Sequence, residues 1–149
     1  MVKVAVLGAS GRMGRAILGC IAEIPDVELV GAVTQAEDPL LGRDAGEAAG
    51  LAAFGVPLSV DRGLALRGAQ VAIDFTLPAA LETNVDACVA HGAALVVGTT
   101  GLESQHFAAL ERAAQHVPIV YGRNMSVGVN LFMEMVARAA SALGDDNDV

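Results

Sequence analysis

Three glycines near the start of the chain have the residue type and spacing of a phosphate-binding turn. Gly8, Gly11 and Gly14 follow the apolar run of residues 2–7 and lead into a helical pattern. A strand that breaks into glycines and resumes as a helix is how a dinucleotide-binding fold begins. Gly8 lets the chain turn, Gly11 leaves the backbone open to a pyrophosphate, and Gly14 lets the helix pack closely. The first N–H groups of that helix are expected to face the phosphates.

This turn departs from the strict G-x-G-x-x-G spacing, because Ser10 stands where a glycine is often found. A glycine turn also occurs in α/β proteins that bind nothing. Its position directly between a strand and a helix favours the binding interpretation. Arg12, at the head of the helix, adds a positive charge suited to a phosphate.

The second expected contact is with the adenosine ribose, at the end of the strand predicted over residues 27–34. An acidic residue is expected there, about 20 residues after the glycine turn. Thr34 occupies that position, Gln35 follows it, and the first carboxylates are those of Glu37 and Asp38. No arginine directly follows the strand either. The sequence therefore predicts neither a strict NAD site nor a strict NADP site.

Apolar runs alternate with helical patterns along the whole chain, which predicts an α/β fold of the Rossmann type, a doubly wound parallel sheet with right-handed crossovers. The predicted strands cover residues 2–7, 27–34, 58–60, 70–76, 94–97 and 118–121. The predicted helices cover residues 12–24, 61–67, 78–90, 103–116 and 126–143. Polar side chains collect just past the strand ends, where open α/β sheets bind ligands: Ser10, Thr34, Thr76, Thr99, Thr100 and Asn124.

Composition narrows the class of protein. The length of 149 residues suits one domain, and a hydrophobic fraction of 54% indicates either a sheet buried on both faces or an apolar face that awaits a partner. The net charge of −8, part of it in the tail 144–148, argues against a nucleic-acid partner. Neither a membrane span nor a signal peptide is recognisable, so we expect a cytoplasmic protein without a membrane partner.

No catalytic group and no metal site is predicted. The histidines, His91, His106 and His116, fall at helix ends or on a surface helix, so we expect structural or solvent-facing roles. Cys20 and Cys88 lie among apolar residues in helical patterns and are interpreted as small buried thiols, not as a disulfide or a metal pair. The residues of the chain, taken by themselves, therefore predict a cofactor-binding edge of the sheet but no catalytic group.

Five motifs along the chain resemble those of the 4-hydroxy-tetrahydrodipicolinate reductase family, also called dihydrodipicolinate reductase, of bacterial lysine and diaminopimelate synthesis. The resemblance spans essentially residues 2–149. The motifs are the glycine turn of residues 4–14, the Leu-Leu-Gly-x-Asp-Ala-Gly stretch of 40–46, Asp-Phe-Thr at 74–76, Gly-Thr-Thr-Gly at 98–101, and the Asn-Met-Ser-Val-Gly-Val-Asn stretch of 124–130.

The resemblance implies a reductase that passes a hydride from NADH or NADPH to the cyclic product of dihydrodipicolinate synthase, giving tetrahydrodipicolinate. It implies that the pyrophosphate is wrapped by Gly8, Ala9, Ser10, Gly11, Arg12 and Met13. It places Gly98, Thr99 and Thr100 at the nicotinamide ribose, Phe75 and Thr76 along the cofactor cleft, and Gly122, Arg123, Asn124 and Met125 beside the nicotinamide. The acidic-plus-arginine pair frequent in the family is Thr34 and Gln35 here, and Arg123 and Met125 stand where alanine and phenylalanine are common.

The resemblance also divides the chain. Residues 1–125 are expected to form the dinucleotide-binding domain, and residues 126–149 the hinge and first helix of a substrate domain that is otherwise truncated. The family's catalytic histidine and lysine, its grip on the small-molecule substrate and most contacts of its homotetramer lie in that further part. The isolated chain is therefore expected to bind cofactor without turnover, and the helix after Ser126 to pack against another copy or fold back on the sheet.

Two alternatives stay open. The chain is also compatible with a dinucleotide-sensing module that has no catalysis, and with the cofactor half of another two-domain dehydrogenase.

Overall fold

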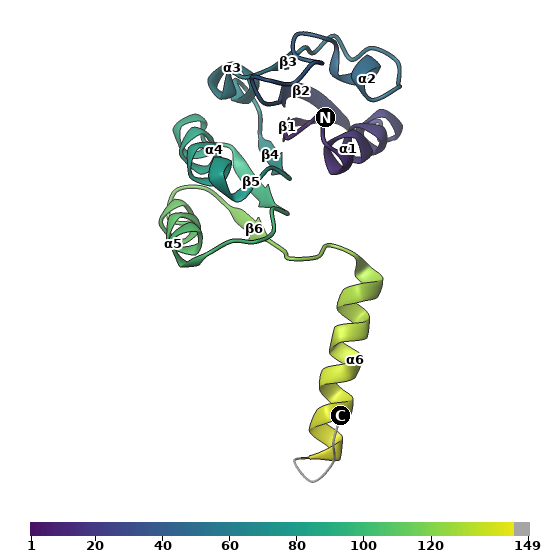
Figure 1. Cartoon of the computed structure of the whole chain (residues 1–149), viewed down its shortest axis with the longest axis vertical. Helices are drawn as coiled ribbons and strands as arrows, with labels where there is room; N and C mark the ends of the chain where they lie inside the picture. Colours follow the sequence, from purple (N-terminus) through teal and green to yellow (C-terminus); the bar gives the residue numbers. More distant parts are fainter. Residues whose placement is uncertain (145–149) are drawn as a thin grey trace.

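A single sheet of six parallel strands organises the chain in the computed structural model, which describes residues 1–144 (Figure 1). The strands lie in the order β3-β2-β1-β4-β5-β6, and every neighbouring pair is parallel. Their bounds are β1 Val2–Leu7, β2 Val27–Val33, β3 Leu58–Ser59, β4 Val71–Asp74, β5 Ala94–Val97 and β6 Ile119–Tyr121. The helices are α1 Arg12–Glu23, α2 Ala45–Ala48, α3 Arg62–Leu66, α4 Pro78–His91, α5 Ser104–Ala113 and α6 Val127–Leu143. The expected Rossmann-type architecture is confirmed.

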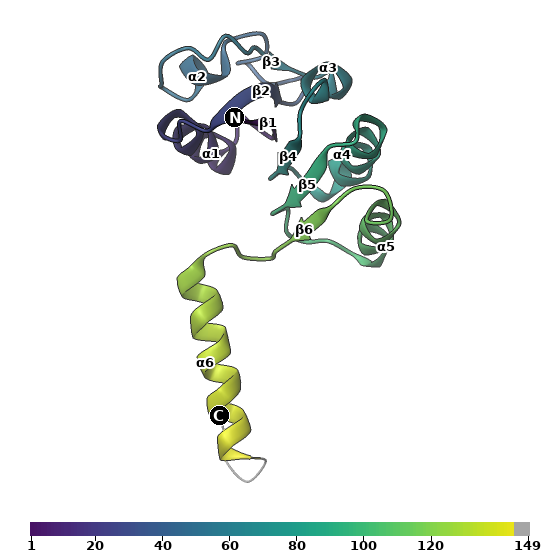
Figure 2. The ribbon, with the colours of Figure 1, turned by 180° about the vertical axis from the view of Figure 1, so that it is seen from behind.

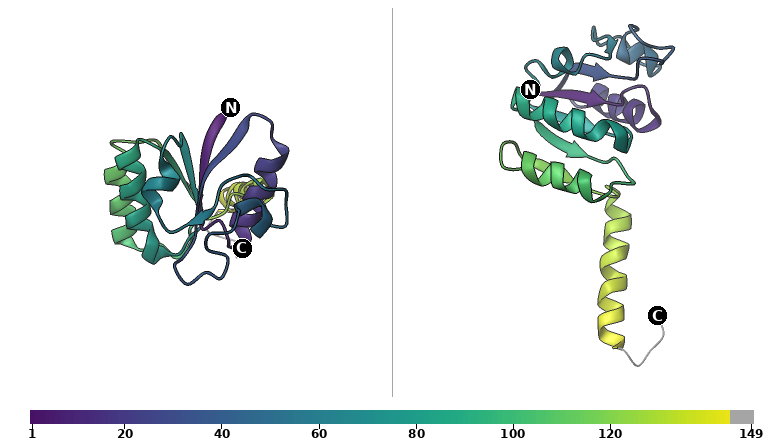
Figure 3. Two further views of the ribbon diagram at one scale, coloured as in Figure 1. Left: turned by 90° about the horizontal axis from the view of Figure 1, so that it is seen from above. Right: turned by 60° about the vertical axis from the view of Figure 1, so that its left-hand side comes forward.

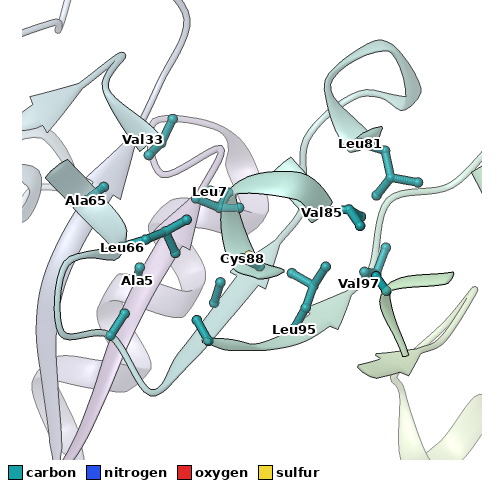
Figure 4. Close-up of a cluster of buried hydrophobic side chains, with 14 of the residues drawn as sticks. Ala5, Leu7, Val33, Ala65, Leu66, Leu81, Val85, Cys88, Leu95 and Val97 are labelled. Atoms are coloured by element: carbon teal, nitrogen blue, oxygen red, sulfur yellow. The ribbon is translucent and has the colours of Figure 1, made fainter. Parts of the chain in front are cut away.

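Helices cover both faces of the sheet: α1 and α2 lie on one side, and α3, α4 and α5 on the other (Figure 3). Successive side chains of a strand point to opposite faces, so β1 feeds both cores. Val4 and Val6 pack with α1, whereas Ala5 and Leu7 join the larger cluster beneath α3 and α4 (Figure 4). A strand buried on both faces has no polar alternation, which is why β1 is continuously apolar over its buried residues 4–7.

The last helix, α6, projects away from the sheet after an extended segment (Figures 1 and 2). None of its described residues is buried, and Phe132 is 64% exposed. The expectation that α6 folds back on the sheet is therefore wrong, because no described element returns to cover its apolar stripe. Packing against another copy stays a prediction. The tail 145–149, with most of the predicted terminal acidic charge, lies outside the described residues.

Local signals position most element ends as predicted. Ser126 caps α6 by accepting the Val129 N–H at 3.4 Å, Pro78 occupies the first turn of α4, and Gly92 ends α4 at φ 67°. His106 is buried as part of the cap of α5, where its Nδ1 accepts the Glu103 N–H at 2.9 Å, so its structural role is confirmed. Cys20 is exposed, and the prediction of a buried thiol there is wrong, because it lies on the solvent side of α1.

Within residues 1–144, none of the helices has the length and apolar character needed to cross a membrane. The same residues include no group of three or more His, Cys, Asp and Glu side chains placed to hold a metal ion.

One aspartate organises the irregular stretch between β2 and β3. The carboxylate of Asp44 accepts five backbone N–H groups, from Gly46, Glu47, Phe54, Gly55 and Val56, at distances of 2.8, 3.3, 3.0, 2.7 and 3.1 Å. Desolvation raises the pKa of Asp44, but these hydrogen bonds outweigh it and leave the pKa below its ordinary value of 3.8. The carboxylate thus closes the loop of residues 44–56 by binding both of its ends.

Asp44→Asn is expected to open this loop. An amide has a single oxygen, so its NH₂ group would face backbone donors that now find a carboxylate oxygen. Amide hydrogen exchange of residues 45–56 is expected to accelerate roughly tenfold. Because the folded-state pKa is depressed, the stabilisation by Asp44 is present above pH 3.8 and is lost as the pH falls through the lowered value.

Asp61→Asn is the matched control. Asp61 caps α3 by accepting one N–H, from Leu64 at 2.9 Å, and asparagine caps helices equally well. Equal acceleration of exchange in the two variants, each measured over its own segment, would contradict the role given to Asp44.

Candidate functional site

Two adjoining cavities open along the carboxyl edge of the sheet. Their volumes are about 680 and 610 Å³, and Gly11, Phe75 and Thr76 line both of them. These shared residues follow β1 and β4, the neighbouring strands at which the strand order reverses. Open α/β sheets bind ligands at such a topological switch point.

The cavities bring together most of the residues singled out from the sequence. The first is also lined by Arg12, Met13, Gly98, Thr99, Thr100, Gly122, Arg123, Asn124 and Met125. The second is also lined by Gly8, Ser10 and Thr34. Ala9 lines neither cavity: it is fully buried, and its N–H donates to the Val33 carbonyl at 2.9 Å. It supports the turn from below, where a contact with a pyrophosphate was expected.

The glycine turn has the geometry that its spacing predicts. Gly8 adopts φ +82°, which L side chains rarely do. A Cβ on Gly14 would lie 2.2 Å from the Gly8 carbonyl oxygen, so α1 packs against the turn itself. Gly11 is the N-cap residue of α1, and no side chain caps this helix end. The first-turn N–H groups therefore have no helical or side-chain acceptor, and the helix begins at Gly11, which lines both cavities.

A buried carboxylate fixes the polar groups between the cavities. Asp74, the last residue of β4, is 0% exposed. Its Oδ1 accepts the N–H and hydroxyl of Thr76 at 2.8 and 2.6 Å and the Thr99 hydroxyl at 3.2 Å, and its Oδ2 accepts Asn84 Nδ2 at 2.8 Å. Thr76 and Thr99 thus commit their hydroxyl protons to Asp74. Sequence analysis placed Asp74 in a motif but assigned it no role, although a carboxylate that ends an apolar strand was a usable signal.

Phe75, which lines both cavities, is held by a close contact with Gly98, the residue after β5. A Cβ on Gly98 would lie 2.2 Å from the Phe75 ring, so only glycine admits the ring at this position. Below this layer lies Cys88, whose pKa burial raises to about 12, with a further contribution from the charge of Asp74. The Cys88 thiol is therefore a packing group and not a nucleophile.

The corner beyond β2 contains a carboxylate that sequence analysis did not place. A turn returns the chain after Thr34, and the Asp38 N–H donates to the Gln35 carbonyl at 3.2 Å. The Thr34 hydroxyl donates to Asp38 Oδ2, and the Leu40 N–H donates to Oδ1 at 2.8 Å. The Ser10 and Thr34 hydroxyls hold the pKa of Asp38 below its ordinary value. A carboxylate thus lies beside Thr34, although in the sequence it comes four residues later.

The segment between β6 and α6 borders the first cavity. The Gly122 N–H donates to the Val97 carbonyl at 3.1 Å, which fixes this segment beside β5. The side-chain oxygen of Asn124, Oδ1, accepts the Ser126 N–H at 2.8 Å. The backbone carbonyl of Asn124 accepts a hydrogen bond from Asn130 Nδ2 at 2.9 Å. The Asn124 side chain therefore shapes the start of α6 as well as lining the cavity.

The sheet order and the cleft at its switch point define a Rossmann-type α/β domain. The family described as dihydrodipicolinate reductase, N-terminus, matches residues 2–125. The chain belongs to this family.

Curated relatives support the assignment. A protein of Alkalilimnicola ehrlichii, named 4-hydroxy-tetrahydrodipicolinate reductase, is 44% identical over 147 residues, which cover 99% of this chain and 55% of that protein. A protein of the same name from Anaeromyxobacter dehalogenans is 46% identical over 149 residues, which cover 100% of this chain and 55% of that protein. The chain thus spans about half the length of these relatives.

A solved structure shares the fold. Dihydrodipicolinate reductase from Paenisporosarcina sp. TG-14, solved with bound dipicolinate, superposes with a TM-score of 0.75 at 22% identity. The match covers 94% of this chain and 54% of that one.

Proposed function

We propose that this chain binds a nicotinamide dinucleotide, NADH or NADPH, in the double cavity, as the cofactor-binding part of a 4-hydroxy-tetrahydrodipicolinate reductase. The observation that carries the proposal is the junction of the two cavities at an uncapped helix start behind a glycine turn. A dinucleotide has two bulky halves joined by a pyrophosphate, and this site offers two compartments joined at an anion-binding position. The family to which the chain belongs supplies the activity.

The residues at the junction fit a diphosphate. A Cβ on Gly11 would meet one atom within 4 Å, the Gly8 carbonyl oxygen at 3.3 Å, so the space above the turn is open to a ligand. The N–H groups of the first turn of α1 and the Arg12 guanidinium bind the two phosphates. The second cavity receives the adenosine half, and the first receives the nicotinamide ribose and ring.

The bound cofactor supplies the hydride for reduction of the substrate. The chain's residues orient it: Phe75 separates the two compartments, Thr99 is fixed by Asp74, and the segment 122–125 borders the ring. The cavity linings within residues 1–144 include no histidine, lysine or cysteine. We assign proton donation and the grip on substrate to the part of the reductase that follows.

The proposed division of the chain follows from this assignment. Residues 1–125 form the dinucleotide-binding domain, and residues 126–149 form the hinge and the start of the substrate domain, whose apolar helix α6 awaits its partners. A cytoplasmic homotetramer acting on a small-molecule substrate, without nucleic-acid or membrane partners, completes the proposal. The homotetramer rests on the family resemblance alone.

Calorimetric titration of the chain with NADH and NADPH tests the site. Gly11→Val is expected to weaken binding roughly tenfold or more, because its side chain fills the space over the first turn of α1. Gly19→Val is the control: this glycine lies on the same helix, and a Cβ there meets nothing within 4 Å. Its affinity is expected to match that of the unmodified chain.

Nicotinamide absorbance with 4-hydroxy-tetrahydrodipicolinate tests the division of the chain. We expect binding without sustained oxidation of the cofactor. Sustained turnover by residues 1–149 would refute the assignment of the catalytic groups to a further part, and absence of any nucleotide binding would refute the site itself.

A further inference from the structure

The carboxylate of Asp38 has acceptor capacity directed to the second cavity. It lines this cavity, and its two oxygens accept hydrogen bonds from the Leu40 N–H and the Thr34 hydroxyl, while the nearby Ser10 hydroxyl also lowers its pKa. A carboxylate has about four lone-pair sites, so these bonds leave capacity for a ligand. The corner beyond β2 thus presents a partly satisfied, half-buried negative charge.

The neighbouring hydroxyls point their protons at this carboxylate. Thr34 has one hydroxyl hydrogen and donates it to Asp38, so Ser10, whose Oγ lies 2.6 Å from Thr34 Oγ1, donates to Thr34. The chain from Ser10 through Thr34 to Asp38 therefore ends on the carboxylate, and both hydroxyl protons are used within it. A ligand at this corner meets acceptors, and it must bring donors of its own.

The charged side chains that line the second cavity carry no net positive charge with which to bind a phosphate. Two arginines, Arg15 and Arg62, are matched by two carboxylates, Glu37 and Asp38. The Nε of Arg15 donates to the Ser10 carbonyl at 2.9 Å, and the Nε of Arg62 donates to Asn84 Oδ1 at 2.6 Å. Each guanidinium thus gives its Nε–H to a protein acceptor, and the two positive charges are equalled in number by the two carboxylates of the lining.

These observations discriminate between the two nicotinamide cofactors. The adenosine ribose of NADH offers two hydroxyl donors, whereas that of NADPH carries a phosphate that has acceptors and a charge of about −2. We propose that this site selects NADH over NADPH, with Asp38 as the specificity-determining residue that accepts the ribose hydroxyls and repels the 2′-phosphate. The inference rests on the proposed function, because it concerns one end of the same cofactor.

Calorimetry on the full chain tests the selectivity. NADH is expected to bind roughly tenfold or more tightly than NADPH, and Asp38→Asn to bring the ratio near parity by weakening NADH and strengthening NADPH. Asp86→Asn is the control, since it removes the same charge from an exposed residue of α4 that lines neither cavity. We expect its ratio to stay within about threefold of that of the unmodified chain.

A second measurement needs no variant. Adenosine 5′-monophosphate is expected to compete with bound NADH more strongly than adenosine 2′,5′-bisphosphate does, because the two differ in the 2′-phosphate alone. Equal affinities for NADH and NADPH, tighter binding of NADPH, or an unchanged ratio in Asp38→Asn would overturn the inference while leaving a nucleotide site in place. Failure of both cofactors to bind would instead overturn the proposed function, and the inference with it.

Discussion

Gly14→Ala is expected to destabilise the chain by about 3 kcal/mol and to abolish nucleotide binding. A Cβ at this position would lie 2.2 Å from the Gly8 oxygen and 2.5 Å from the Ala9 oxygen, both of them backbone atoms. Relief of that overlap requires α1 to move away from the turn. The movement would separate Leu18 and Ile21 from the sheet and would displace the first-turn N–H groups from the cavity junction.

The same helix offers a matched control in Gly19→Ala. A Cβ at Gly19 meets no atom within 4 Å, and alanine favours a helix over glycine by about 1 kcal/mol. This variant is expected to be as stable as the unmodified chain or more stable, with full affinity. Urea denaturation followed by circular dichroism measures the difference, and similar unfolding midpoints for both variants would contradict the close packing of α1 against the turn.

The glycine turn was predictable because its geometry is local. The positions of Gly8, Gly11 and Gly14 relative to one strand and one helix follow from a few successive residues, and the structure shows the turn at Gly8 and the close approach of α1 at Gly14. The sheet followed from the alternation of apolar runs with helical patterns, since right-handed crossovers leave few arrangements for such a chain. Only the ends shifted, as in α5, which stops at Ala113 where the pattern extended to residue 116.

What sequence analysis missed depends on contacts between separate elements. Asp38 reaches the end of β2 only because the chain turns after Gln35, and a count of residues from the glycine turn cannot register that return. The partners of Asp74 come from α4 and from the end of β5, at separations of 10 and 25 residues. For α6, the apolar stripe predicts that one face of the helix is buried, but it does not identify the element or partner that covers this face.

The second large effect is expected from Asp74→Asn, which replaces a buried carboxylate by an amide of the same shape. Whichever way the amide is oriented, its NH₂ group faces a donor: Asn84 Nδ2 on one side, or the Thr76 backbone N–H on the other, where the hydroxyls of Thr76 and Thr99 also donate now. A buried polar group left facing donors costs about 1–3 kcal/mol, and the bonds lost here are charge-assisted. We expect a loss of about 3 kcal/mol in stability and roughly tenfold in NADH affinity, because both threonines line the first cavity.

Asp86→Asn separates this effect from a simple change of charge. Asp86 is an exposed residue of α4, and its replacement is expected to change stability by less than about 0.5 kcal/mol. Thermal unfolding and calorimetry on the two variants give the comparison. If Asp74→Asn changed stability and NADH affinity as little as Asp86→Asn, the Asp74 carboxylate would not be what positions Thr76 and Thr99.

A reciprocal exchange tests the hydrogen-bond directions themselves. In the double variant Asp74→Asn with Asn84→Asp, the new amide can donate to the new carboxylate while its oxygen still accepts from Thr76 and Thr99. The carboxylate at position 84 can also accept from Arg62, as Asn84 Oδ1 does at 2.6 Å. Because the exchange restores donor–acceptor complementarity, the double variant is expected to lose less stability than the sum of the two single losses, by about 1 kcal/mol or more. Strictly additive losses would mean that Asp74 and Asn84 act through their separate surroundings and not through the bond between them.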